Sequence, residues 1–229
     1  MPRQRRRKIV RRRKARKMVP GWGGAIGRMA GVGMSYVSKG GMAYKALRLA
    51  RKVADAVNIE YKILDTTGSA GAVDYGGGVA TLNSVAQGTA DNQRIGDSLK
   101  VQNNVLRWFM QRNGQDCLFR IILFWDEQNQ VTAVSDILES TGSALAVVSP
   151  KNYDNRFRTK VIFDEVHRLT TNTPLITRDM THAINQHTQF TAASTTIRTG
   201  ALKLAVISNV TSTNLPTYSY YNRMSFTDN

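Results

Sequence analysis

The chain has 229 residues, of which 41% are hydrophobic, and a formal net charge of +16. This length lets a single domain bury a full core. The single cysteine, Cys117, excludes an internal disulfide and a Cys-rich zinc site, and we expect neither a secretory signal nor a transmembrane helix, since no apolar run approaches about 18 residues.

The positive charge is confined to the beginning of the chain. Residues 1–52 contain 17 Lys or Arg and no Asp or Glu. Residues 53–229 contain 15 basic and 16 acidic residues, a net charge of −1. A uniformly basic surface would indicate non-specific binding to many anionic partners, whereas this segregation of charge predicts a cationic tail with a partner of its own.

Residues 1–41 are predicted to form a disordered arm. Residues 1–17 carry 11 basic side chains, which repel one another and offer no face to bury. Residues 20–41 contain eight glycines and should behave as a flexible tether. A merely solubilising tail is the alternative to a binding arm.

The arginines of the arm match phosphate oxygens and stay charged at any relevant pH. Because no aromatic or base-reading pattern accompanies them, we expect salt-dependent binding of a polynucleotide without sequence preference. The predicted nucleic-acid-binding residues are Arg3, Arg5, Arg6, Arg7, Lys8, Arg11, Arg12, Arg13, Lys14, Arg16, Lys17, Lys45, Arg48, Arg51 and Lys52. A nuclear localisation signal is predicted at Arg5, Arg6, Arg7, Lys8, Arg11, Arg12, Arg13 and Lys14.

Residues 42–55 are predicted to form a short basic amphipathic helix. Apolar residues recur there at spacings of three and four, and the basic residues Lys45, Arg48 and Lys52 lie on another face. A membrane-surface helix is the alternative, which the alanine-rich apolar face, without Trp or Phe, disfavours.

Residues 56–229 are predicted to form an all-β domain, either an antiparallel sandwich or a barrel. Val57, Ile59, Tyr61 and Ile63 alternate with polar residues, which predicts a half-buried strand. Further strands are predicted at Val79–Asn83, Ser98–Gln111, Cys117–Asp126, Ala144–Val148, Arg156–Arg168, Thr188–Ile197, Ala201–Val210 and Tyr218–Phe226, with loops at Thr66–Gly78 and Gly88–Asp97.

Nothing in the chain has the pattern of a catalytic or metal site. The three histidines are His167, His182 and His187, and no acidic residue stands beside them at a metal-ligand spacing. We therefore interpret them as satisfied surface or interface residues and predict no enzyme activity, a metal enzyme of the cupin type included. Cys117 begins an apolar run and should lie in the core, and Asp126 is expected to have a loop or strand-end role.

Three segments of the body, in this order, resemble the coat proteins of small icosahedral viruses with circular single-stranded DNA genomes. They are Arg94-Ile95-Gly96-Asp97 before a strand, FRIILFWDEQNQ at 119–130, and YDNRFRTKVIFDEVHRL at 153–169. The similarity is greatest to the branch whose capsids resemble that of satellite tobacco necrosis virus. The glycine- and methionine-rich tether at 20–41 departs from that pattern.

This resemblance implies a single jelly-roll sandwich of eight main strands. It also implies a homo-oligomeric shell of about 60 copies, with inward arms that package single-stranded DNA. The implied partners are a nuclear import receptor and a host receptor to which no residue is assigned, and the implied locations are the virion and, during assembly, the host nucleus. No cofactor is expected. A structural divalent cation at subunit interfaces is known in similar capsids, and no residue is assigned to one.

A second hypothesis is a cellular nucleic-acid-binding protein of the ribosomal or chromatin type with a basic tail. It predicts monomers or dimers and a binding patch on the folded body. The net charge of −1 on residues 53–229 disfavours such a patch and favours the capsid hypothesis.

Overall fold

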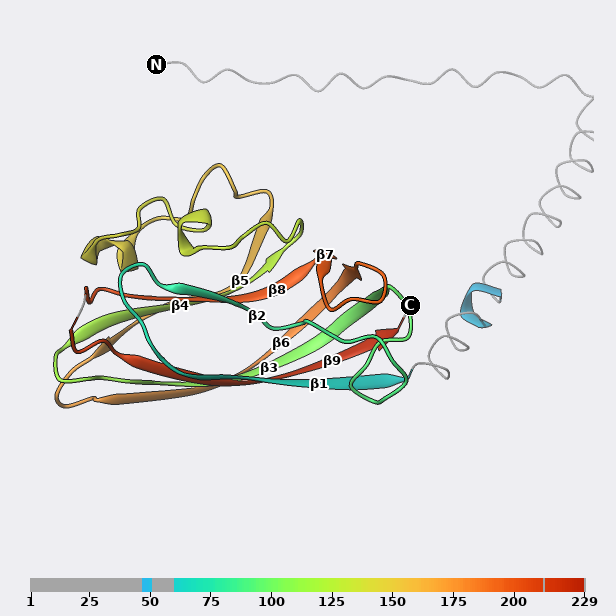
Figure 1. The fold of residues 1–229 in the computed structure, drawn as a ribbon, viewed down its shortest axis with the longest axis horizontal. Coiled ribbons are helices and arrows are strands. Elements are labelled where there is room, and N and C mark those ends of the chain that lie inside the picture. Colours follow the sequence, from blue (N-terminus) through green and yellow to red (C-terminus); the bar gives the residue numbers. More distant parts are fainter. Residues whose placement is uncertain (1–46, 51–59, 212, 229) are drawn as a thin grey trace, which may run out of the picture. The chain divides into compact units, whose positions relative to one another are not determined.

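The computed structural model describes residues 47–50, 60–211 and 213–228 (Figure 1). The chain divides into two compact units, Met1–Asn58 and Ile59–Asn229. In the first unit, residues 47–50 are helical, and they fall within the helix predicted at 42–55. The rest of that helix, the arm at 1–41 and the predicted strand residues Val57 and Ile59 lie outside the described residues.

The second unit is built almost entirely of antiparallel strands. The strands are β1 (Tyr61–Ala72), β2 (Gly78–Thr81), β3 (Ser98–Gln111), β4 (Cys117–Asp126), β5 (Thr159–Leu169), β6 (Leu175–Phe190), β7 (Ile197–Thr199), β8 (Ala201–Ser208) and β9 (Thr217–Asp228). Two short 3₁₀ helices, η1 (Val134–Asp136) and η2 (Ala144–Val148), lie between β4 and β5.

The strands form two sheets whose order identifies the fold. One sheet has the order β1-β9-β3-β6-β7 and the other the order β2-β8-β4-β5. Most consecutive strands therefore lie in opposite sheets, and only β4-β5 and β6-β7 are neighbours within one sheet, as in the Greek keys of a jelly roll. The fold is a jelly-roll sandwich, which confirms the prediction, and the three-residue β7 extends the five-stranded sheet.

The main core fills the space between the two sheets. Residues of β3 such as Leu106 and Met110 pack with Phe119 and Leu123 of β4 and with Phe226 of β9, and all five are fully buried. Tyr218, Tyr220, Met224 and Phe226, which are spaced by even numbers of residues, share the inward face of β9.

A second core lies on the other side of the four-stranded sheet. The connection between β4 and β5, residues 127–158, covers this face, as Figure 1 shows above β4 and β8. Val134, Ile137 and Val147 of this connection pack against Ile122 and Phe124. Because both faces are covered, β4 reads as a continuous apolar run rather than an alternation.

A β-bulge in β3 changes which residues face the core. The register with β6 and β9 shifts between Val101 and Asn103. Leu99 and Val101 face inward before the shift, and even-numbered residues from Asn104 onward do so after it. An extra residue in one strand reverses its faces in this way.

Two predicted strand boundaries are wrong. Ala144–Val148 forms the 3₁₀ helix η2 instead of a strand, and only Ala146 and Val147 of this helix pack into the second core. Thr188–Ile197 is not one strand, since β6 ends at Phe190 and a turn precedes β7. Most of β6 was missed because one of its faces is exposed and its sequence is largely polar.

The orientation predicted for the first strand is also wrong. Tyr61 and Ile63 point to solvent, whereas Lys62 is buried. The Lys62 ammonium lies 2.9 Å from Asp228 and donates a hydrogen bond of 3.0 Å to the Gln93 carbonyl. These partners compensate the buried charge of Lys62, so Tyr61 and Ile63 can face the solvent.

Part of the loop predicted at 66–78 is strand as well, since β1 pairs with β9 as far as Ala72. The pairing shifts register between Gly68 and Gly71. A Cβ atom at Gly68 would lie 2.1 Å from the Tyr220 ring, so the Tyr220 side chain occupies the space that a larger residue at position 68 would need.

Candidate nucleic-acid interface

The predicted nucleic-acid interface lies almost wholly outside the described residues. Of its members only Arg48 is described, with an exposed side chain in the helical segment 47–50. Leu47 and Leu49 are exposed beside it. The binding role of Arg48 and of the arm residues stays a prediction, and in the described part of the chain no helix is long and apolar enough to cross a bilayer.

The folded body neutralises most of its own cations. Of the 15 Lys and Arg in residues 53–229, nine have a carboxylate oxygen within ion-pair distance among the described residues: Lys62, Arg94, Arg107, Arg112, Arg120, Lys151, Lys160, Lys203 and Arg223. A phosphate backbone would therefore have to compete with an existing carboxylate at most basic positions of the body.

Arg94 begins the first of the three segments that resemble viral coat proteins, and its buried side chain connects two loops. Its guanidinium donates hydrogen bonds to the carbonyls of Gly96 and Ser194, the latter at 2.7 Å. It also lies 3.3 Å from the Asp97 carboxylate and 4.3 Å from the centre of the Phe190 ring. Arg94 thus joins the loop before β3 to the loop after β6.

Arg120, in the second segment, anchors the connection that covers the four-stranded sheet. It donates two hydrogen bonds to Asp164, at 2.8 and 2.9 Å, and two more to the carbonyls of Val147 and Ser149. Burial raises the pKa of Asp164, but the hydrogen bonds and the charge of Arg120 outweigh it, so that pKa lies below its usual value.

Asp126 ends β4 and forms a buried ion pair with Lys203. The two side chains lie 3.0 Å apart, and Lys203 also donates to the Val131 carbonyl at 2.6 Å. The Asp126 carboxylate accepts the backbone N–H groups of Val131 and Gln128. The strand-end role expected of Asp126 is therefore structural: it fixes the chain where the connection to β5 begins.

The outer face of the five-stranded sheet carries an open depression of about 510 Å³ lined by aromatic and charged residues. Arg107 there pairs with Asp179 at 2.8 Å, and Arg223 pairs with Asp65 at 2.7 Å. The hydrogen bonds from Arg223, followed by one from Tyr221, lower the pKa of Asp65 to about 2. A phosphate would therefore have to displace a carboxylate from Arg107 or Arg223 to bind there, whereas Arg178, which also lines the depression, has no ion pair among the described residues.

The histidines form no metal site. In the described part of the chain, no group of three or more His, Cys, Asp or Glu side chains is arranged to hold an ion. His182 is half-buried, and its Nε2 has no hydrogen-bond partner among these residues, so its interpretation as a satisfied surface or interface histidine stays a prediction. His167 is partly buried, with its ring 5.2 Å from Trp108. Cys117 is buried, as predicted, and burial raises the pKa of its thiol.

One exposed cluster was not predicted as a site, although it lies in the third resemblance segment. Tyr153 and Phe157 are highly exposed, and the Arg156 guanidinium lies between their rings. The sequence signal was the presence of two aromatic residues around an arginine in a stretch that was otherwise interpreted as the approach to a strand.

Comparisons with known proteins do not assign a family. No family model matches the sequence, and no curated protein matches it. A structure of Desmodium yellow mottle tymovirus aligns with 74% of this chain and 87% of its own, at 7% identity and a TM-score of 0.37. A structure of the Gx strain of infectious bursal disease virus aligns with 74% of this chain and 33% of its own, at 13% identity and a TM-score of 0.29.

Proposed function

We propose that this chain is a viral capsid protein that assembles into a small icosahedral shell of about 60 copies. Its basic N-terminal arm packages single-stranded nucleic acid, for which the sequence resemblance favours DNA over RNA. The observation that carries the proposal is the division of charge between residues 1–52, with 17 basic and no acidic residues, and the remainder, with a net charge of −1.

This division suits a shell for two electrostatic reasons. A near-neutral body lets copies pack side by side without the repulsion that +16 per copy would create across every contact. About 60 arms would bring roughly a thousand positive charges together, a number comparable to the phosphates of a small genome. Most cations of the jelly roll are paired with carboxylates of the body, which supports the proposal because the unpaired positive charge is then concentrated in the arm.

The proposal extends to the route of assembly. The basic cluster between Arg5 and Lys14 serves as a nuclear localisation signal and binds an import receptor, so assembly takes place in the host nucleus. The same side chains bind nucleic acid once the receptor has released them, since both partners use the same positive charge.

The test is to express the full chain and fractionate the product by sedimentation and electron microscopy. We expect uniform closed shells whose nucleic acid resists added nuclease, and digestion of the extracted contents with DNase and with RNase separately identifies the sugar. Monomers or dimers that bind nucleic acid in a nuclease-accessible form would overturn the proposal in favour of a cellular nucleic-acid-binding protein.

A further inference from the structure

The segment before β5 presents two aromatic rings to solvent. Phe157 is 79% exposed and Tyr153 is 66% exposed. The Arg156 guanidinium carbon lies 3.5 Å from the centre of the Tyr153 ring and 4.1 Å from that of Phe157, so the three side chains form one continuous surface. We name Tyr153, Arg156 and Phe157 the aromatic knob.

The backbone that carries the aromatic knob is firmly held. The Tyr153 N–H donates a hydrogen bond of 2.6 Å to the Glu139 carboxylate. The Asn155 side-chain amide donates one of 2.7 Å to the Asp136 carbonyl, and the Thr159 N–H donates to the Asn155 carbonyl. A rigid loop that exposes Tyr, Arg and Phe has the composition and preorganisation of a binding hot spot, whereas scattered exposed apolar residues need no such explanation.

The charge of the aromatic knob is unbalanced. Among the described residues Arg156 has no carboxylate partner, and its guanidinium donates to the Tyr153 carbonyl at 2.6 Å. Nearby Arg158 bonds the neutral Gln130 side chain, and Lys151 and Lys160 have acidic partners. The exposed Asp154 lies in the same segment and forms no ion pair with Arg156. A surface that complements the knob must therefore combine apolar groups with unpaired carboxylates.

The body itself has one such surface, at the start of β1 and the loop before β3. Tyr61, Ile63 and Ile95 are 63%, 48% and 59% exposed. Glu60 and Asp91 are exposed carboxylates there, and the Ile63 N–H donates to the Asp91 carbonyl at 3.2 Å, which holds the two segments together. We name these five residues the apolar–acidic patch.

Two cations next to the apolar–acidic patch are turned inward, whereas Lys100 of β3, which shares the register partner Thr227 with Tyr61, lies on the outward side of its strand. Lys62 and Arg94 are buried and bonded to carbonyls and carboxylates of the body. The Asp97 side chain, at the edge of the patch, stays 57% exposed. Neither Glu60 nor Asp91 has an ion-pair partner among the described residues, so the patch has carboxylates available for an incoming arginine.

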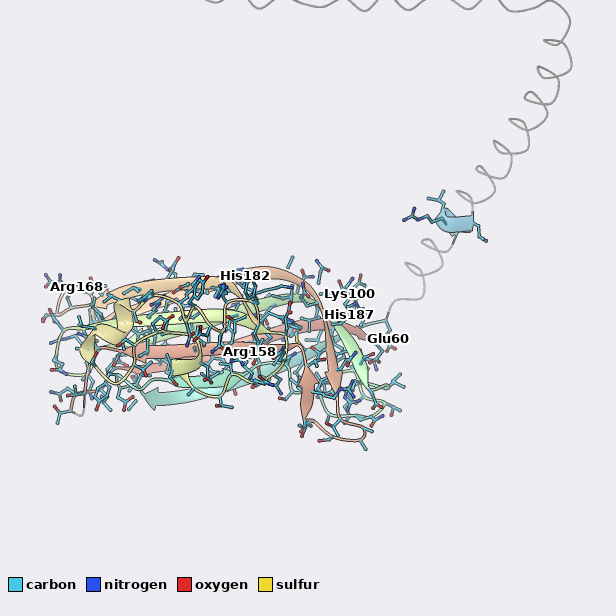
Figure 2. All side chains as sticks on the ribbon, turned by 90° about the horizontal axis from the view of Figure 1, so that it is seen from above. Glu60, Lys100, Arg158, Arg168, His182 and His187 are labelled. Carbon is cyan, nitrogen blue, oxygen red and sulfur yellow. The ribbon has the colours of Figure 1, made fainter. Side chains whose placement is uncertain are left out.

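We propose that the aromatic knob of one copy binds the apolar–acidic patch of a second copy. The two surfaces lie on different parts of the body, the knob ahead of β5 on the covered side of the four-stranded sheet and the patch at the start of β1 in the other sheet (Figure 1). Figure 2 shows Arg158, which follows the knob, and Glu60 well separated along the body. A knob meeting another knob would instead bring two Arg156 side chains together.

A contact between two different surfaces is heterologous, and it closes copies into rings when the rotation permits. A closed shell needs such ring-forming contacts around its symmetry axes. The inference rests on the proposed function, since it names one of the surfaces through which the capsid copies associate.

Cysteine cross-linking tests which surfaces meet. The native Cys117 is buried, so cysteines introduced in the full chain by Phe157→Cys and Ile95→Cys can be joined by a short bismaleimide. We expect the double variant to give a ladder of dimers and higher oligomers on a denaturing gel, and each single variant to stay monomeric. Dimers from Phe157→Cys alone, or no ladder from the double variant, would overturn the proposal.

Charge reversal tests the electrostatic part of the contact. Arg156→Glu should lower the assembled fraction by about tenfold or more, as loss of a hot-spot residue does, and adding Glu60→Arg and Asp91→Arg should restore part of it. Arg168→Glu is the matched control, because it reverses an exposed arginine outside both surfaces. Circular dichroism establishes that each variant is folded.

The outcomes separate this inference from the function on which it rests. If the unsubstituted chain never forms shells, the capsid proposal fails. If it forms shells and Arg156→Glu forms them equally well, the capsid proposal stands and only this interface is wrong. If Arg156→Glu leaves the shells intact but lowers their nucleic-acid content, the knob contacts nucleic acid and the inference is overturned.

Discussion

Single buried side chains hold the long connections of this body against its sheets. Arg94, Arg120 and Lys203 each place a cation among carbonyl and carboxylate groups from distant parts of the chain. A buried charge with good partners is tolerated, but removing one partner leaves the other uncompensated. Arg94 and Arg120 lie in two of the segments, 94–97 and 119–130, that resemble viral coat proteins, and both side chains hold loops of the body in place.

His182 should make folding stability depend on pH. Its ring is partly buried, 6.2 Å from the Phe163 ring, and burial lowers its pKa below the usual value of 6.5. The unfolded chain therefore takes up a proton at a higher pH than the folded chain, so the free energy of unfolding falls as the pH drops below 6.5.

We therefore expect the thermal midpoint of unfolding to decrease between pH 7.5 and about pH 5, and His182→Leu to weaken that decrease. Burial also lowers the pKa of His167, against the opposing effect of Glu165, so part of the dependence should persist in the variant. His187→Gln, which alters an exposed histidine of the same strand, is the control. An identical pH dependence of the thermal midpoint in His182→Leu and in the unsubstituted chain would show that His182 does not contribute to it.

At the scale of elements, the connection between β4 and β5 acts as a third layer. Its 3₁₀ helices cover one face of the four-stranded sheet while the other sheet covers the opposite face. Burial on both faces explains why β4 and β8 are mostly apolar, and exposure of one face explains why β6 is largely polar and was missed as a strand.

Phe124→Asp should unfold the body. Phe124 is fully buried in the second core, so the substitution removes a large apolar side chain and adds an unpaired charge, at a cost of at least about 3 kcal/mol. Leu175→Asp is the control, since Leu175 is about half exposed at the start of β6. The thermal midpoint should fall strongly for Phe124→Asp and slightly for Leu175→Asp. Equal midpoints for the two variants would contradict the burial of Phe124 beneath the connection between β4 and β5.

At the scale of the whole molecule, the excess positive charge and the described core lie in different parts of the chain. Every basic residue in excess lies in residues 1–52, and the described core lies entirely in the second unit. The proposed capsid function requires this separation, because the cation-rich part must bind a polyanion while the rest packs against copies of itself.

Deleting residues 1–17 should leave the body folded and abolish packaging. The deletion removes 11 positive charges and none of the described core, so the thermal midpoint of the body should be unchanged and the nucleic-acid content of the particles should be lost. A full-length variant with those 11 residues replaced by Gln separates charge from length. Binding by the unsubstituted chain should weaken steeply with salt, since about ten counterions are released. Normal packaging by the truncated chain would show that the arm is not the packaging element.

The sequence by itself determined the charge division, the absence of internal disulfides and the all-β class, because charge counts and alternating apolar residues are local properties of a chain. The orientation of β1, the buried pairing of Lys203 with Asp126, and the aromatic knob with its apolar–acidic patch were decided only by the tertiary structure. Each depends on contacts between residues far apart in sequence, such as Lys62 with Asp228, and no local pattern of side chains encodes which distant partner will compensate a buried charge.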